Sequence, residues 1–167
     1  MQAAGFFKKN RRALEECRAL GHRYPEITSW IRADKGDFRL VKEVGVKETI
    51  PSDTVIFSES DEATRLYVVE RGRVAIKASL QGGKWAPVCA VSPGEVFGWS
   101  CLVPPYRFTA SATSLEETAV TYYEASKLRE LFTREPGIGY AMMQNVAELV
   151  TSRLKNVRLE LLGIVYM

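Results

Sequence analysis

The sequence has few of the residues that usually carry metal or acid–base chemistry. Among 167 residues it holds one histidine, His22, and three cysteines, Cys17, Cys89 and Cys101. The cysteines are odd in number, widely spaced and outside any ligand motif, so the sequence predicts reduced thiols and no metal site. No Cys–His, Ser–His or paired-carboxylate arrangement is recognisable, so we predict no catalytic residues and do not expect an enzyme.

Long apolar runs are missing as well. No stretch approaches the roughly 20 apolar residues that a membrane-spanning helix needs. The N-terminus also lacks a signal-peptide pattern, because only a short apolar patch precedes its first lysines and arginines. An apolar content of 46% with 26% charged residues is typical of a globular protein. We therefore expect a cytoplasmic protein that makes no membrane contact.

The net charge of +3 is small and unevenly distributed. Residues 1–39 hold nine Lys/Arg against five Asp/Glu, and residues 3–20 have the apolar spacing of an amphipathic helix. Since Glu15 and Glu16 interrupt the basic run, a solvated helix face is the simplest interpretation, and its role stays open. We divide the chain into an N-terminal helical segment, 1–39, and a second unit, 40–167.

From about residue 40 the pattern changes to short strands separated by turns. The predicted strands cover residues 41–50, 54–57, 66–69, 73–77, 85–91, 109–112 and 119–123. Residues 70–72 predict a compact hairpin connection in which Gly72 has a positive φ. Many short strands at close, even spacing favour an antiparallel β-roll or jelly roll.

Beyond residue 123 the apolar period becomes helical. A short helix is predicted over 126–132 with Ser126 as its cap, followed by a long helix over about 138–162. One apolar stripe of the long helix suits packing against the β-roll: Ile138, Met142, Val146 and Leu149. A second stripe has the spacing of a coiled-coil seam: Met143, Ala147, Val150, Leu154, Val157 and Leu161. Both stripes being buried within one chain is the alternative; we favour a homodimer, because the second stripe continues past the first.

Residues 94–112 contain the candidate site. Gly94 and Gly98 flank a short apolar run, and residues 100–102 predict one helical turn that prolines then stop. The start of a helix presents free N–H groups and the positive end of a dipole, which favour an anion. Arg107 follows and offers a fork of donors suited to a phosphate. This stretch therefore predicts an anion pocket, most simply for a phosphate ester.

The same stretch resembles the phosphate-binding cassette of cyclic nucleotide-binding domains. That cassette reads roughly Phe-Gly-Glu, an aliphatic turn, then Pro-Arg and small residues, and this chain supplies residues 97–98, Pro105 and Arg107. It departs from the family at Trp99, which stands where the family has the Glu that binds the ribose hydroxyl. A second departure is Phe108, where a small residue is usual.

The resemblance extends over about residues 44–158 and includes the strand 66–69 that leads to Gly72. The family usually has glycine where this chain has Asp53 and Ser60, and both are common turn residues. The resemblance implies a mostly β fold, a cyclic nucleotide-binding-like β-roll with an N-terminal helical segment and a long C-terminal helix.

By function, the resemblance implies a small-molecule sensor used in signal transduction and transcription regulation. The ligand-binding residues expected from it are Phe97, Gly98, Trp99, Ser100, Cys101, Arg107, Phe108 and Thr109. The implied ligand is a cyclic nucleotide (cAMP or cGMP) or another phosphate-bearing molecule. We expect weak or altered preference for cyclic nucleotides, because Trp99 cannot supply the ribose-binding carboxylate.

Two alternatives stay open for the mode of action. Trp99 could fill the place of the sugar, which would leave a ligand-free dimeric interaction or scaffold module of the same fold. The family's transcription factors carry a helix-turn-helix after the long helix, whereas only residues 163–167 follow it here. We therefore expect no direct DNA binding, and a homodimer or a protein partner instead.

Overall fold

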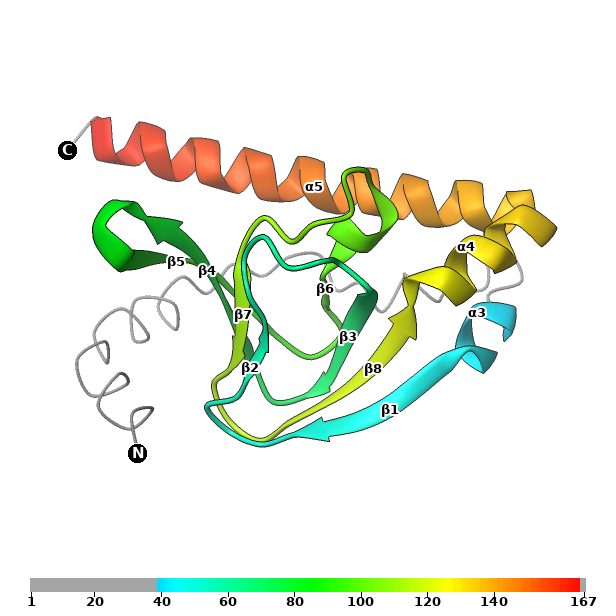
Figure 1. Cartoon of the computed structure of the whole chain (residues 1–167). Coiled ribbons are helices and arrows are strands. Elements are labelled where there is room, and N and C mark those ends of the chain that lie inside the picture. The colour runs from blue at the N-terminus through cyan, green and yellow to red at the C-terminus, as the bar shows by residue number, and fades with distance from the viewer. Residues whose placement is uncertain (1–38, 166–167) are drawn as a thin grey trace.

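Residues 39–165 are described by the structure, a computed structural model (Figure 1). The helix predicted over 3–20, together with Cys17 and His22, lies outside the described residues. The described elements follow one another as α3 (Arg39–Glu43), β1 (Gly45–Ile50), β2 (Val55–Phe57), β3 (Arg65–Arg71), β4 (Val74–Leu80), η2 (Gln81–Gly83), β5 (Lys84–Val91), β6 (Val96–Phe97), η3 (Trp99–Leu102), β7 (Ser111–Ser114), β8 (Thr118–Glu124), α4 (Ala125–Arg134) and α5 (Pro136–Val165).

Two four-stranded antiparallel sheets form the β-roll, with strand orders β1-β8-β3-β6 and β2-β7-β4-β5. Apolar residues from both sheets meet between them: Leu66 and Val69 on one sheet, Val74 and Val91 on the other, are fully buried. This arrangement, with helices flanking antiparallel sheets, confirms the predicted fold class.

The predicted hairpin at residues 70–72 is wrong. β3 pairs with β8 and β6, whereas β4 pairs with β5 and β7, so the turn carries the chain from one sheet to the other. The positive φ predicted for Gly72 is confirmed at +86°, and a Cβ there would lie 2.7 Å from the Glu117 carbonyl oxygen. The sequence therefore predicts the conformation of this turn, but strand pairing depends on β7 and β8, which lie much further along the chain.

Several element boundaries differ from the prediction; the strand predicted over 109–112, for example, is β7 at Ser111–Ser114. Residues 41–43 belong to the helical turn α3 and not to a strand, and the strand β1 begins only at Gly45. Helix α4 begins at Ala125 after Glu124, and no side-chain cap precedes it, so Ser126 is its second residue. Helix α5 begins earlier than predicted, at Pro136, because proline lacks the N–H that the first helical position leaves unpaired.

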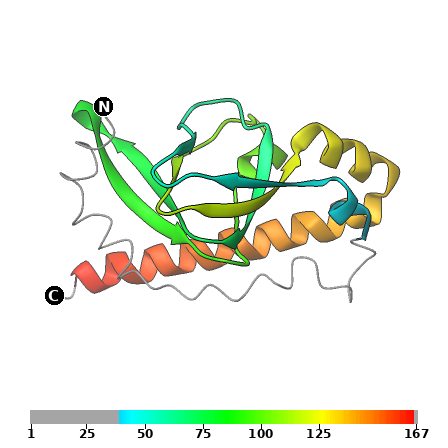
Figure 2. The same cartoon turned by 90° about the horizontal axis from the view of Figure 1, so that it is seen from below.

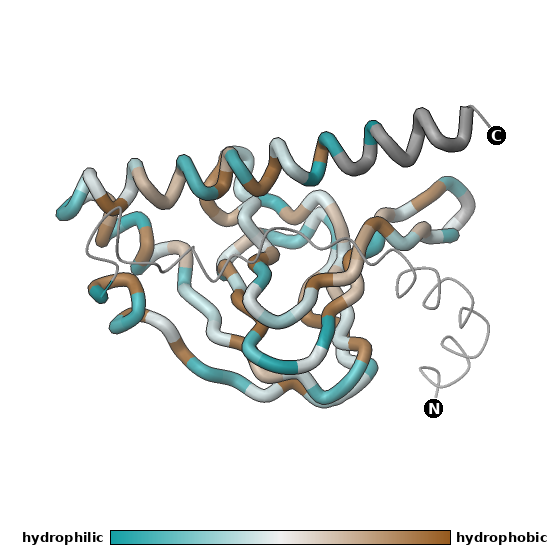
Figure 3. The backbone as a smooth tube through the Cα atoms, turned by 180° about the vertical axis from the view of Figure 1, so that it is seen from behind, coloured by the Kyte–Doolittle hydropathy of each residue, from teal (hydrophilic) through white to brown (hydrophobic). Residues whose placement is uncertain are grey.

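Helix α5 runs along one side of the β-roll (Figures 1 and 2). The first predicted stripe is confirmed, because Ile138, Met142, Val146 and Leu149 are all buried in the same core as the sheets. The second stripe is exposed in the single chain: the exposed fractions are 39% for Met143, 42% for Val150 and 68% for Leu154, and Ala147 is also exposed. Val150 and Leu154 nevertheless border a cavity between α5 and the β-roll, so the stripe does not lie wholly on the far side of the helix. The side chains of Val157 and Leu161 are not described. Apolar residues recur along the described part of the helix (Figure 3).

Candidate functional site

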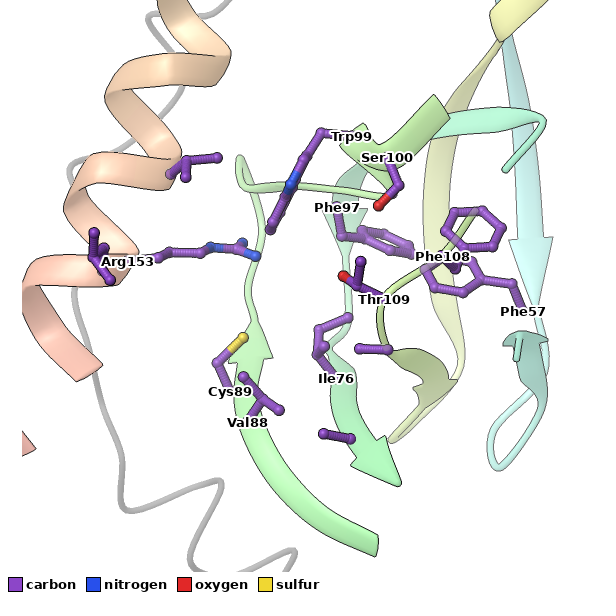
Figure 4. Close-up of a pocket in the computed structure, with 15 residues that line it drawn as sticks. Phe57, Ile76, Val88, Cys89, Phe97, Trp99, Ser100, Phe108, Thr109 and Arg153 are labelled. Carbon is purple, nitrogen blue, oxygen red and sulfur yellow. The ribbon is translucent and has the colours of Figure 1, made fainter. Parts of the chain in front are cut away.

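A cavity of about 340 Å³ lies between the β-roll and α5 (Figure 4). Its size is within the range of small-molecule sites. Strands β2, β4, β5 and β6, the turn η3, the segment 108–110 and α5 all contribute to its wall. The lining residues are Phe57, Ile76, Ala78, Val88, Cys89, Phe97, Gly98, Trp99, Ser100, Phe108, Thr109, Ala110, Val150, Arg153 and Leu154.

Aromatic rings form one wall of the cavity. Phe108 stacks on Phe57 with 3.6 Å between ring centroids and 7° between planes, and Phe57 lies 6.0 Å from Phe97. All three side chains are buried. Because packed aromatic rings offer a flat apolar surface at little cost in conformational entropy, this wall suits a planar, carbon-rich ligand body.

The turn η3 is built as the sequence predicted, one helical turn after Gly98. Gly98 has a φ of +81°, and a Cβ there would lie 2.9 Å from the Arg65 carbonyl oxygen, so only glycine fits without a shift. The Cys101 N–H donates to the Gly98 carbonyl oxygen at 3.2 Å. This tight entry from β6 brings Trp99 and Ser100 to the cavity wall.

Arg153 of α5 closes the cavity on the side of the helix. Its guanidinium carbon lies 4.2 Å from the centroid of the Trp99 indole, and its Nη2 donates to the Val96 carbonyl oxygen at 3.1 Å. A cation over an indole face is attracted by the ring quadrupole. Figure 4 shows the side chain reaching from α5 toward Trp99. Among the described residues that line the cavity, Arg153 is the one with a charged side chain.

Sequence reasoning missed Arg153, since it lies far along the chain from the cassette. Its position could have been predicted from the helix period, because a residue four positions after Leu149 lies on the same face of α5 as Leu149, which is buried.

Arg107 is not among the lining residues. Backbone hydrogen bonds join residues 106 and 108 to residues 60–63, and Phe108 is buried there whereas Arg107 is exposed. The Arg107 side chain is exposed, and its Nη1 donates to the Ser60 carbonyl oxygen at 2.8 Å.

Cys101 is also outside the cavity wall and is fully buried. Burial raises the pKa of the Cys101 thiol to about 12, against a smaller opposing effect of the Arg129 guanidinium. Since the thiolate is the reactive form, this thiol is inert near neutral pH. The Arg129 Nη1 donates to the Cys101 carbonyl oxygen at 3.0 Å, which ties η3 to α4.

Of the predicted site residues, the structure brings one group together at the cavity: Phe97, Gly98, Trp99, Ser100, Phe108 and Thr109. Whether any of them contacts a ligand stays a prediction. Within residues 39–165, no group of three or more His, Cys, Asp or Glu side chains is arranged to hold a metal ion. In the same range, no helix is long and apolar enough to cross a membrane.

Comparison with known proteins relates the chain to nucleotide-responsive regulators. A family profile described as cyclic nucleotide-binding domain matches residues 47–135. The cyclic AMP receptor protein of Thermus thermophilus is 30% identical over 111 residues, which are 66% of this chain and 50% of that protein. A putative cyclic nucleotide-binding protein from Geobacter metallireducens has a crystal structure that is 31% identical, with a TM-score of 0.64 over 73% of this chain and 89% of that one.

A shorter match links the chain to an enzyme. Citrate (Re)-synthase of Clostridium kluyveri is 57% identical over 44 residues, which are 26% of this chain and 10% of the enzyme. The chain thus spans half or less of the length of these curated relatives. The profile match covers more than half of the chain, and the β-roll, the cassette turn and the long helix agree with it. The chain therefore belongs to the cyclic nucleotide-binding domain family, among relatives of the CRP-like regulators.

Proposed function

We propose that this domain is a small-molecule sensor, a regulatory unit without catalytic activity, whose ligand occupies the cavity between the β-roll and α5. The observation that supports this most directly is that one cavity is lined by both the cassette turn and the long helix. A ligand there would contact both parts at once. Its binding would then change how α5 packs, which is how a sensor passes a signal to a partner.

Cyclic nucleotides are the first ligands to consider, and Trp99 is expected to weaken their binding. The position would otherwise supply a carboxylate to the ribose hydroxyl, and losing a hydrogen bond to a charged group costs about 1.5–3 kcal/mol, roughly one to two decades in affinity. The aromatic wall formed by Phe57 and Phe108 can still stack against a purine.

Isothermal titration of the full chain with cAMP and cGMP tests this proposal. We expect weak binding by the natural protein and about 10- to 100-fold tighter binding by Trp99→Glu, with Trp99→Gln as the matched control that lacks the charge. If folded protein gives no heat with millimolar ligand in any of the three forms, the cyclic nucleotide proposal is wrong.

We further propose that the domain forms a homodimer through α5. Exposed apolar side chains along one helix face are costly in water and are typical of an interface. Met143, Val150 and Leu154 are exposed apolar side chains of this kind, and Val150 and Leu154 also line the cavity, so the proposed seam borders it.

The same face supports a second candidate function, a dimeric scaffold that binds no ligand. In that case the Trp99 indole and Arg153 would close the cavity permanently. A stable dimer that shows no binding heat in isothermal titrations with small anions would favour the scaffold over the sensor.

A further inference from the structure

We propose that the cavity between the β-roll and α5 takes an uncharged, planar aromatic molecule in preference to an anion. The inference rests on the proposed function, because it requires that a small molecule occupies the cavity. It adds the chemical class of the ligand, and it depends on the apolar wall and on the partners that the nearby charged groups already have.

Apolar side chains make up most of the cavity wall, and some of them are in contact with water. Val88 of β5 and Val150 and Leu154 of α5 line the cavity and are exposed in the single chain. A bound molecule with an apolar body would remove their surface from water, which favours binding in proportion to the area covered. The exposed part of the wall therefore favours a carbon-rich ligand.

The aromatic part of the wall favours a flat ligand. The Phe57 and Phe108 rings are 7° from parallel, and the Phe97 ring is inclined by 29° to Phe57 (Figure 4). Planar aromatic molecules pack on such rings in offset stacks, which a flexible aliphatic chain cannot do. Ser100 and Thr109 add hydroxyl groups to the wall, and these can bond a neutral polar substituent.

The guanidinium at the wall already interacts with the protein itself. The Arg153 Nη2 donates to the Val96 carbonyl oxygen, and the guanidinium lies over the Trp99 indole. Burial raises the pKa of the Glu95 carboxyl group, and the Ser92 N–H and the Arg153 guanidinium oppose that rise, so Arg153 also acts on a carboxyl group. An anionic ligand would compete with these interactions, whereas a neutral ligand leaves them in place.

Two anion donors predicted from the sequence are engaged elsewhere. Arg107 does not line the cavity, and its Nη1 donates to the Ser60 carbonyl oxygen. The Cys101 N–H donates to the Gly98 carbonyl oxygen within the turn η3. Moving an anion out of water is costly unless new hydrogen bonds replace those to water, so this cavity disfavours a charged ligand.

A matched pair of fluorescent probes tests the preference. N-phenyl-1-naphthylamine and 8-anilinonaphthalene-1-sulfonate share one aromatic body, and only the second carries a sulfonate. In titrations of the full chain we expect the neutral probe to bind roughly tenfold or more tightly than the sulfonate, because the anion would lose water and compete with the present partners of Arg153.

A charge placed on the cavity wall gives a second test. Trp99→Glu should weaken the neutral probe roughly tenfold or more, because a carboxylate replaces an apolar ring, and Trp99→Phe should weaken it less. The same Trp99→Glu variant is expected to bind cyclic nucleotides more tightly, so the two ligand classes should respond in opposite directions. If Trp99→Glu does not fold, Thr109→Asp at an exposed position replaces it, with Thr109→Val as its uncharged control.

Further variants show whether the neutral probe binds in the cavity. Ala110→Phe fills the cavity and should abolish binding of the probe, with Ala78→Phe as the replacement if that variant does not fold. Arg107→Gln changes a side chain outside the cavity and should leave the affinity unchanged.

The outcomes separate the inference from the proposed function. If binding is lost in the filled-cavity variant but the sulfonate binds as tightly as the neutral probe or more tightly, the inference is wrong and the sensor proposal stands. The same holds if Trp99→Glu does not weaken the neutral probe. If neither probe nor cyclic nucleotide binds, or if binding survives in the filled-cavity variants, both are wrong.

Discussion

At the scale of the residue, Arg107 and Phe108 are neighbours in the cassette, and only Phe108 lines the cavity. Phe108 takes the inward position and stacks on Phe57. Arg107, the preceding residue, is exposed and donates to the Ser60 carbonyl oxygen. A small residue at 108 would leave the interior open, so the bulk of this one side chain shapes the site as much as the replacement at Trp99 does.

Ser60 pays a conformational cost that a substitution can remove. Its φ of 73° lies in the left-handed region, where a non-glycine residue is strained by roughly 1–2 kcal/mol. Glycine relieves that strain but loses about 0.4–1 kcal/mol through greater freedom in the unfolded chain. We expect Ser60→Gly to raise the free energy of unfolding by up to about 1.6 kcal/mol in urea titrations.

Ser58→Gly is the matched control for that substitution. Ser58 lies in the same loop, is exposed, and is not among the positive-φ residues. It should lose about 0.4–1 kcal/mol, because glycine only adds freedom to the unfolded chain there. Equal losses for both variants would contradict the strain argument.

Glu95 is expected to make stability depend on pH. The side chain is buried in the turn before β6, and desolvation raises the pKa of its carboxyl group against weaker opposing effects of the Ser92 N–H and the Arg153 guanidinium. The folded state therefore binds the proton more tightly than the unfolded chain. The stability from this group is complete below the unfolded value, 4.5, and is lost as the pH rises through the folded pKa.

Glu95→Gln tests this directly, because glutamine can accept the same hydrogen bond from the Ser92 N–H. Urea unfolding between pH 4 and 8 should show a variant at least as stable as the natural protein at pH 7 and a flatter profile above pH 4.5. A variant that is less stable at pH 7 would mean that attraction to Arg153 outweighs the desolvation of the carboxylate.

At the scale of the element, α5 carries one buried apolar stripe and one exposed apolar stripe. One face packs into the core through Ile138 and Leu149, and the other leaves Met143 and Leu154 exposed. Arg153 connects α5 to the cassette, because its side chain contacts the Trp99 indole and donates to the Val96 carbonyl oxygen. Because Val150 and Leu154 of the exposed stripe also line the cavity, a ligand there would change the surroundings of both Arg153 and the proposed dimer seam.

The outer face gives a prediction about assembly. Met143→Glu places a charge in the proposed seam away from the cavity and should weaken the dimer roughly tenfold or more, because a buried unpaired charge is costly. Gln144→Glu is the matched control, since it adds the same charge at the next exposed position of α5. Sedimentation velocity measures both. A natural protein that is monomeric at high concentration, or equal effects of the two variants, would exclude this seam.

At the scale of the whole molecule, a ligand that bridges the β-roll and α5 should stabilise both together. Binding to the folded state alone raises stability by about 2.7 kcal/mol when the ligand is at 100 times its dissociation constant. We expect thermal unfolding to remain a single transition that shifts upward with cAMP, and more strongly for Trp99→Glu than for the natural protein. If the unfolding temperature rose for the β-roll alone or for α5 alone, ligand binding in the cavity would not couple these two parts.

Much of this architecture could be predicted from the spacing of apolar and glycine residues along short stretches of the sequence. Alternating apolar residues predict strands wherever one face must be buried, and the four- and three-residue steps from Ile138 to Leu149 predict the inner face of α5. The turn at Gly98 was also predictable, because a tight turn needs glycine whatever surrounds it. These features depend on a few consecutive residues, so the sequence by itself determined the β-roll, the long helix and the cassette turn.

Contacts between distant segments were decided only by the tertiary structure. The placement of β3 and β4 in opposite sheets depends on pairing with β8 and β7, which no local turn signal encodes. The same holds for the cavity, where Arg153 lies beside Trp99 while Arg107 is held away by Ser60. Side-chain direction at such points follows from packing among segments far apart in the chain, which the spacing of neighbouring residues does not specify.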